Sequence, residues 1–185
     1  MVASAFLPVT IYKNRIHFLF GKEAHDDSAP GFSDFGGGVK PNEDIYYAGL
    51  REFAEETTGF LGDAKELEKM ITKNGGCYSL VHGDYHIHIF RMDYDPMLVQ
   101  YYNNSHQFIA KRVDAKTLRK TMIFEKVEIE WMTANEMRQR RSEFRHFYRE
   151  ILDQILLEVP QIEKFIQSTK PRNVKSSVRK SRRKY

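Results

Sequence analysis

The sequence predicts a protein of the α/β class, because segments typical of strands and segments typical of helices are interspersed along its 185 residues. Segments rich in β-branched and aromatic residues, which favour strands, lie at residues 3–12, 15–22, 77–93 and 123–133. Segments with helical features lie at residues 63–74 and 134–157. A hydrophobic content of 41% is enough for a core, and the length suits one domain with an appendage.

Turn residues set the expected connections. Lys13-Asn14 suits a tight turn, so residues 3–22 are a predicted hairpin, and residues 77–93 are a second one that turns near Gly83-Asp84. Residues 25–34 are expected to form a loop, because turn-forming residues dominate them. Residues 95–120 are compatible with a helix that begins at Pro96, followed by a loop or another helix.

The most informative stretch runs from Gly36 to Phe60, where three glycines lead into a predicted helix. Asn42 is the expected N-cap of this helix. Glu52, Glu55 and Glu56 have the spacing i, i+3 and i+4, which puts them on one helix face. Like charges at this spacing repel unless something neutralises them, and Mg²⁺ prefers such hard oxygen ligands. The alternative is an ordinary acidic amphipathic helix with a solvated face.

These residues resemble the signature of the Nudix hydrolase family, G-x5-E-x7-R-E-U-x-E-E-x-G-U, in which U is a bulky apolar residue. The positions that match are Gly37, Glu43, Arg51, Glu52, Phe53, Glu55 and Glu56. Two residues, Thr57 and Thr58, stand before Gly59 where the family has one, which should alter the helix exit but not the ligand spacing. The run from Ser33 to Gly59 is most similar to Nudix sequences of large DNA viruses and protists.

The resemblance implies an α/β/α sandwich with a mixed β-sheet over about residues 3–158, and hydrolysis of a pyrophosphate bond in a nucleoside diphosphate linked to another group. It implies Mg²⁺ or Mn²⁺ as cofactor, with metal ligands Glu52, Glu55, Glu56 and the carbonyl of Gly36. Arg51 would orient the carboxylates. Gly37 and Glu43 would support the loop and the metal site.

A further candidate precedes the strand that contains Trp131. Nudix enzymes often carry an additional glutamate there, and Glu125 lies six residues before the tryptophan. Glu125 is a candidate metal ligand or general base, with Glu128 as its competitor, while Glu130 should point away from the contacts of Trp131. Whether Glu52 or Glu125 takes the proton from water stays open at this point.

The C-terminal part divides into three segments. We expect a long amphipathic helix at residues 134–157, a break at Pro160 that ends the 1–160 domain, and a short helical end at 161–169. Residues 170–185 hold eight Lys or Arg and no acid, although the net charge of the whole chain is only +4. This basic tail should be disordered. Candidate RNA contacts in it are Arg179, Lys180, Arg182, Arg183 and Lys184, with nuclear import or solubility as alternative roles.

Other features suggest the compartment and the substrate. A single cysteine, Cys77, suits a reducing compartment, and neither a secretion signal nor a membrane-spanning run is expected, which favours the cytoplasm or nucleus. Among Nudix substrates, the basic tail favours capped RNA and thus mRNA decapping. The alternatives are free nucleotides, dinucleoside polyphosphates and diphosphoinositol phosphates, or a catalytically silent module that binds RNA or protein. The oligomeric state stays open.

Overall fold

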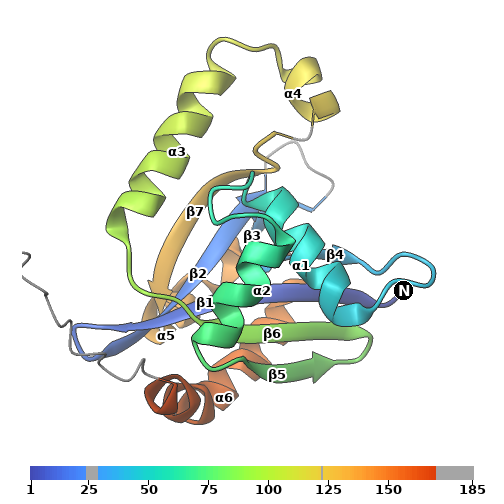
Figure 1. Ribbon diagram of the computed structural model, residues 1–185. Coiled ribbons are helices and arrows are strands. Elements are labelled where there is room, and N and C mark those ends of the chain that lie inside the picture. Colours follow the sequence, from blue (N-terminus) through green and yellow to red (C-terminus); the bar gives the residue numbers. More distant parts are fainter. Residues whose placement is uncertain (24–28, 122, 170–185) are drawn as a thin grey trace, which may run out of the picture.

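The computed structural model describes residues 1–23, 29–121 and 123–169, which form a sheet with helices on both faces (Figure 1). The strands are β1 (Ala3–Tyr12), β2 (Arg15–Glu23), β3 (Gly31–Ser33), β4 (Phe35–Gly38), β5 (Cys77–His82), β6 (Tyr85–Arg91) and β7 (Lys126–Thr133). The helices are α1 (Ile45–Glu56), α2 (Ala64–Lys73), α3 (Pro96–Ala110), α4 (Ala115–Thr121), α5 (Ala134–Gln139), the 3₁₀-helix η1 (Arg141–Glu143) and α6 (Tyr148–Ser168).

The sheet is mixed, as expected, and β1 is its central strand. β1 runs parallel to β6 on one side, while its other side is shared by β4 along its first half and β2 along its second half, both antiparallel. β2 continues past β1 and pairs with both β3 and β7. The short β4 strand therefore begins beside the middle of β1, ends beside its first residue and packs against α1.

Successive residues of β1 belong to different cores, because strand side chains alternate between the two faces of the sheet. Phe6 packs with Leu50 and Phe53 of α1, whereas Leu7 packs with Ile151 and other residues of α6. Helices α1, α2 and α3 contribute to one core and α6 to the other. The α/β/α sandwich is thus confirmed.

Both predicted hairpins are confirmed. Lys13 and Asn14 have φ values of 48° and 59°, which a two-residue turn with the right twist requires. The predicted loop at residues 25–34 is partly wrong, because Gly31–Ser33 form β3 against the end of β2. The glycine run is likewise not a simple turn, since Phe35–Gly38 form β4. Neither segment has the length or apolar pattern that marks a strand in sequence.

The N-cap of α1 is Asp44 and not Asn42. The Asp44 carboxylate accepts hydrogen bonds from the backbone N–H groups of Tyr46 and Tyr47, at 2.9 and 3.2 Å. Asn42 instead has a left-handed backbone, with φ at 64°. Both residue types cap helices well, so the choice depends on the backbone path out of β4.

The long helix predicted at residues 134–157 is also wrong. Its first part is α5, which ends at Gln139, and α6 begins only at Tyr148. Between them Phe144 forms an isolated β-bridge with Phe32, and the Arg145 N–H donates to the Phe32 carbonyl at 3.0 Å. Pro160 does not end the helix, because α6 continues to Ser168 and buries Ile162 and Ile166.

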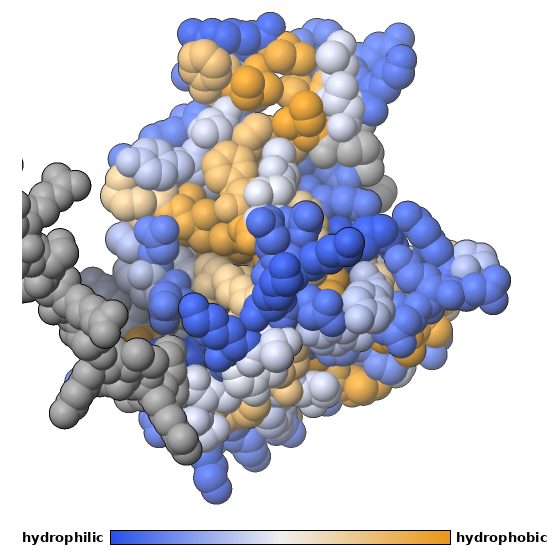
Figure 2. Space-filling model, in the orientation of Figure 1, coloured by the Kyte–Doolittle hydropathy of each residue, from blue (hydrophilic) through white to orange (hydrophobic). Residues whose placement is uncertain are grey.

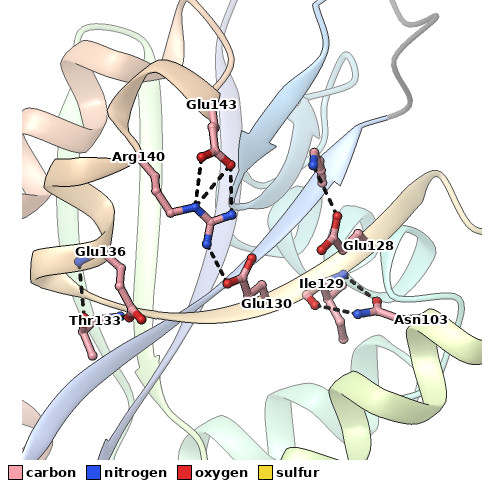
Figure 3. Close-up of polar contacts among 9 residues, drawn as sticks. Asn103, Glu128, Ile129, Glu130, Thr133, Glu136, Arg140 and Glu143 are labelled. Carbon is pink, nitrogen blue, oxygen red and sulfur yellow. Dashed lines mark hydrogen bonds and ion pairs between the residues drawn. The ribbon is translucent and has the colours of Figure 1, made fainter.

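Helix α3 begins at Pro96, as the sequence allowed, and follows β7 along the edge of the sheet (Figure 1). The Asn103 side chain pairs with both the N–H and the carbonyl of Ile129, at 2.8 and 3.1 Å, so it replaces a neighbouring strand at that residue (Figure 3). Apolar surface gathers along the α3–α4 arm (Figure 2), where Tyr101 and Phe108 are exposed. No helix in the described ranges is long and apolar enough to cross a membrane.

Candidate active site

The candidate site lies where α1 crosses β4, and the glycines of β4 permit this close approach. A Cβ at Gly37 would lie 2.6 Å from the carboxyl carbon of Glu52, so any other residue there would displace that carboxylate. A Cβ at Gly36 would collide with Ala5 of β1. The neighbours that crowd both glycines therefore belong to the protein itself.

Gly36 presents its backbone to the helix. Its N–H donates to Glu56 Oε2 at 2.8 Å instead of pairing with β1. In an antiparallel strand the N–H and the carbonyl of one residue point to the same side. The Gly36 carbonyl therefore lies on the strand edge that faces α1, which is the direction required of the predicted metal ligand.

Arg51 connects three of the predicted carboxylates. Its guanidinium donates to Glu43 through two nitrogens, at 2.8 and 2.9 Å, and to Glu52 and Glu55, at 2.6 and 3.2 Å. Glu43 also accepts from the Lys40 N–H, and these bonds, above all those from Arg51, lower the pKa of Glu43 to about 2. The predicted orienting role of Arg51 thus has a geometric basis, and Glu43 is the residue that fixes Arg51.

Glu56 is in a different environment from Glu52 and Glu55. Its side chain is buried, whereas that of Glu55 is 52% exposed. Glu56 Oε1 pairs with the ammonium group of Lys126 at 2.9 Å. Burial raises the pKa of Glu56 to about 8, with Lys126 opposing this shift and Glu23 adding to it.

Lys126 is a residue of the site that the sequence argument missed. It is fully buried at the start of β7, where its ammonium contacts Glu23 at 2.5 Å and Ser33 at 3.3 Å. Arg145 also pairs with Glu23, at 2.9 Å. Burial disfavours the charged lysine, but Glu56 and Glu23 outweigh it and raise the pKa of Lys126. No local sequence pattern indicates this contact, because Glu23 and Lys126 are 103 residues apart.

Glu125 lies on the bend just before β7 and is half-buried. Burial raises the pKa of Glu125, and the negative charges of Glu23, Glu52 and Glu55 raise it further, while Lys126 opposes the shift. Its competitor Glu128 pairs with Lys22 at 3.3 Å. Glu130 pairs with Arg140 at 2.6 Å (Figure 3), on the opposite side of β7 from Trp131, as expected.

The donor set suits a divalent metal ion, although the carboxylates do not converge on one point. Among the described residues, no group of three or more His, Cys, Asp or Glu side chains is arranged to hold a metal ion. Glu52 and Glu55 are held by Arg51, and Glu56 is held by Lys126. Carboxylate and carbonyl oxygens are nonetheless the ligands that Mg²⁺ and Mn²⁺ prefer. Metal binding at Glu52 and Glu55 requires their rotation away from Arg51.

Neither the pocket beside α2 nor the predicted tail contacts form part of the described site. A pocket of about 540 Å³ lies between α2 and the start of α3, lined by residues that include Phe60, Lys69, Lys73 and Met92; none of the predicted site residues lines it. The predicted tail contacts, Arg179, Lys180, Arg182, Arg183 and Lys184, lie outside the described residues.

Comparison with known proteins places the fold. No protein-family model matches the sequence, and a search of curated proteins gave no match. Among solved structures, the NUDIX domain of Shewanella oneidensis NrtR, complexed with ADP ribose, has a TM-score of 0.50 at 10% identity, covering 86% of this chain and 88% of that one. An Ap4A hydrolase of C. elegans has a TM-score of 0.47 at 13% identity, covering 88% of this chain and 98% of that one. A NUDIX hydrolase from Nitrosomonas europaea has a TM-score of 0.38 at 16% identity and covers 92% of each chain. The chain has the fold of the Nudix hydrolases.

Proposed function

We propose that this protein is a metal-dependent Nudix pyrophosphohydrolase, which cleaves the phosphoanhydride bond of a nucleoside diphosphate linked to another group. The observation that carries the proposal is the position of Glu52 beside the glycine edge of β4, with Arg51 bonded to both Glu52 and Glu55. Seven residues of the signature occupy this one region. An acidic helix with no function would not need Gly37 beneath Glu52.

The candidate metal ligands are Glu52, Glu55, Glu56 and the carbonyl of Gly36. Mg²⁺ or Mn²⁺ held there would polarise the phosphate and lower the pKa of bound water. Arg51 keeps the carboxylates of Glu52 and Glu55 aligned until the metal arrives. Glu125 or Glu52 would accept the proton from the attacking water, and burial raises the pKa of Glu125 in the direction that a general base needs. Because acidic side chains repel a polyphosphate, the metal is needed for substrate binding as well.

The substrate class that we propose first is capped RNA. The basic tail supports this choice, because clustered Lys and Arg bind the phosphate backbone of RNA without sequence preference. The lone Cys77 is compatible with work in the cytoplasm or nucleus. Free nucleotides, dinucleoside polyphosphates and diphosphoinositol phosphates are the alternatives within the same chemistry.

The direct test is a screen of pyrophosphate substrates with Mg²⁺ and with Mn²⁺, comparing the parent protein with Glu55→Gln. Turnover that requires metal and disappears in Glu55→Gln supports the hydrolase. If the folded parent protein turns over none of the pyrophosphates with either metal, the enzyme proposal fails.

A catalytically silent RNA-binding or protein-binding module is the second candidate. It is favoured by the engagement of Glu52, Glu55 and Glu56 with Arg51 and Lys126 instead of with a common point. For this module, RNA binding would be the same for the parent protein and Glu55→Gln, and neither would show turnover. The same pair of proteins therefore separates the two functions.

A further inference from the structure

The α3–α4 arm, residues 96–121, differs in charge from the rest of the folded body (Figure 1). It holds five Lys or Arg and a single acid, Asp114, so its formal charge is +4. Residues 1–95 and 122–169 together have a formal charge of −8. The Asp114 carboxylate is engaged at the start of α4, where it accepts from the Thr117 N–H at 3.0 Å. The arm is therefore a positive region on an otherwise acidic body.

The cations of the arm are available to a ligand. Lys111, Lys116 and Lys120 are exposed, and none of them pairs with an acid in the part of the chain that the structure describes. The Arg112 guanidinium lies 3.8 Å from the centre of the Phe108 ring and donates to the Phe108 carbonyl at 3.2 Å. An aromatic ring and a guanidinium held together in this way offer flat surfaces on which nucleic-acid bases stack.

Helix α3 also presents apolar and aromatic side chains to solvent. Met97, Tyr101 and Phe108 have the spacing i, i+4 and i+11, so they share one face of the helix. They are 41%, 57% and 55% exposed, whereas Tyr102, on the inner face, is fully buried. Figure 2 shows apolar surface along this arm. Continuous exposed apolar surface of this kind marks an interaction site.

The inner face of the arm is anchored at the candidate active site. The Phe124 ring packs against those of Tyr102 and His106, with centroids 5.2 and 5.7 Å apart, and Glu125 follows directly in the chain. Lys111 lies nine residues beyond Tyr102, which is about 13 Å farther along the helix axis. A nucleotide chain whose terminal phosphates occupy the candidate site therefore has the outer face of the arm within reach of its next nucleotides.

We propose that the outer face of the α3–α4 arm binds single-stranded RNA, with bases stacked on Tyr101 and Phe108 and phosphates paired with the exposed lysines. The proposal rests on RNA as the proposed substrate class, and it adds a contact on the folded body to that of the basic tail. Charge argues against a second copy of this chain as the occupant, because a two-fold contact would bring the same lysines together.

The first test removes charge from the arm of the full chain. Binding is measured by fluorescence anisotropy with an uncapped single-stranded RNA of tens of nucleotides, in EDTA, at several salt concentrations. The triple variant Lys111→Gln/Lys116→Gln/Lys120→Gln should bind at least about tenfold more weakly, and its slope of log K against log salt should be shallower by up to about 2. An unchanged affinity and slope in the folded variant would contradict the proposal.

The matched control makes the same change on α2. The triple variant Lys65→Gln/Lys69→Gln/Lys73→Gln also removes three exposed lysines, but residues 63–74 hold three acids and have no net charge. Its RNA affinity should stay within about threefold of that of the parent protein. An equal loss in the two triple variants would mean that RNA senses only the total charge, and the arm would not be the binding surface.

The second test removes an aromatic ring and leaves the charge unchanged. Phe108→Ala should weaken binding of the single strand at least about fivefold with the same salt slope, and should leave binding of duplex RNA unaltered, because paired bases cannot stack on the ring. Phe147→Ala is the control, since Phe147 is 48% exposed next to α6, outside the arm. Equal affinities of the two variants for the single strand would exclude stacking on the arm.

These measurements separate the arm from the proposed hydrolase, because they require neither metal nor turnover. Weakened RNA binding in the arm variants, with no pyrophosphate turnover in the parent protein, would support the arm and reject the enzyme. Turnover in the parent protein, with RNA binding unaffected by the arm variants, would do the reverse. Binding to phosphatidylserine vesicles that is lost in Phe108→Ala, while RNA binding is kept, would assign the arm to a membrane surface and overturn the proposal.

Discussion

Two carboxyl groups on either side of the glycine edge have opposite environments. Glu43 is bonded to Arg51 and to a backbone N–H, which holds its pKa near 2. Asp34, one residue before β4, is buried, and its burial raises its pKa to about 6 despite a hydrogen bond of 2.6 Å from the Tyr85 hydroxyl. The second oxygen of Asp34 has no hydrogen-bond partner among the described residues. The folded protein therefore favours the protonated form of Asp34 and the ionised form of Glu43.

The raised pKa of Asp34 predicts a pH effect on stability. Its ordinary pKa is 3.8 and its folded value is about 6, so the folded state holds the proton more tightly than the unfolded chain. The stability from this proton is complete below pH 3.8 and is lost as the pH rises through 6. A shift of this size corresponds to about 3 kcal/mol.

Asp34→Asn should remove this dependence, because an amide of nearly the same shape does not ionise. We expect the free energy of unfolding of Asp34→Asn, relative to the parent protein, to rise by up to about 3 kcal/mol between pH 4 and pH 7. Urea unfolding in EDTA across this range measures the difference. Parallel curves for the two proteins would show that Asp34 titrates normally.

The two carboxylates of α1 that pair with Arg51, Glu52 and Glu55, carry a prediction about catalysis. Glu52→Gln or Glu55→Gln removes a charge that would hold the metal, so kcat should fall at least about 100-fold with little change in stability. Glu163→Gln on α6 is the matched control, because it makes the same change on the other face of the sheet and should leave kcat unaltered. Steady-state kinetics with Mg²⁺ measure all three variants, and a Glu55→Gln enzyme with near-parent kcat would exclude Glu55 as a ligand.

At the scale of elements, α3 connects the two segments that carry the acidic residues. The Tyr102 hydroxyl is buried 3.0 Å from the Glu56 carbonyl and 2.9 Å from the Lys126 carbonyl. It can donate to one of them at a time. Tyr102 thus ties the end of α1 to the start of β7, and with them Glu56 to Lys126. The position of the site therefore depends on a helix that contributes no predicted catalytic residue.

Tyr102→Phe should reveal this connection. Loss of the hydroxyl removes the hydrogen bond that it donates to one of the two carbonyls, which should lower the free energy of unfolding by about 1–2 kcal/mol. We also expect a lower kcat, because Glu125 and the end of α1 would be held less firmly. Tyr101→Phe is the control, since Tyr101 is exposed on the same helix. Equal stability of the two variants, measured by urea unfolding, would rule out the connection.

The sequence predicted those elements whose signals are local. The turns at Lys13-Asn14 and Gly83-Asp84 lie next to the strands that they join, so both hairpins were found, and α1 and α2 were found from helical patterns within their own segments. The break between α5 and α6 was missed because it depends on Phe144 meeting Phe32, which is 112 residues away. Apolar periodicity continues through that break, since Met137, Phe144 and Tyr148 are all core residues.

The same limit applies to the site. Glu52, Glu55, Arg51 and Gly37 were found because their spacing on one helix and its preceding strand is visible in the sequence. Lys126 was not, since its function depends on Glu23 and Gly21 of β2, and only the pairing of β2 with β7 brings them together. Contacts across the sheet determine what the signature cannot, namely which of its carboxylates pairs with a buried lysine.

At the scale of the whole molecule, charge is separated between the folded body and the tail. Residues 170–185 carry eight positive charges and no negative ones, so residues 1–169 have a formal charge of −4. An acidic body around acidic metal ligands repels a nucleic acid, whereas the tail attracts it. For an RNA-end hydrolase, the tail would supply the long-range attraction and the metal the local one.

This division predicts how the tail affects turnover. Deleting residues 170–185, with their eight positive charges, should weaken RNA binding and make the slope of log K against log salt shallower by up to about 6, because a single strand loses roughly 0.7 counterions per neutralised phosphate. It should also reduce kcat/KM for capped RNA of tens of nucleotides while leaving hydrolysis of the free cap dinucleotide unchanged, since the dinucleotide is too short to reach the tail. Filter binding at several salt concentrations and kinetics on both substrates measure these effects. If capped RNA is cut no faster than the dinucleotide and the deletion changes neither rate, the tail does not select RNA, and a free nucleotide becomes the better substrate assignment.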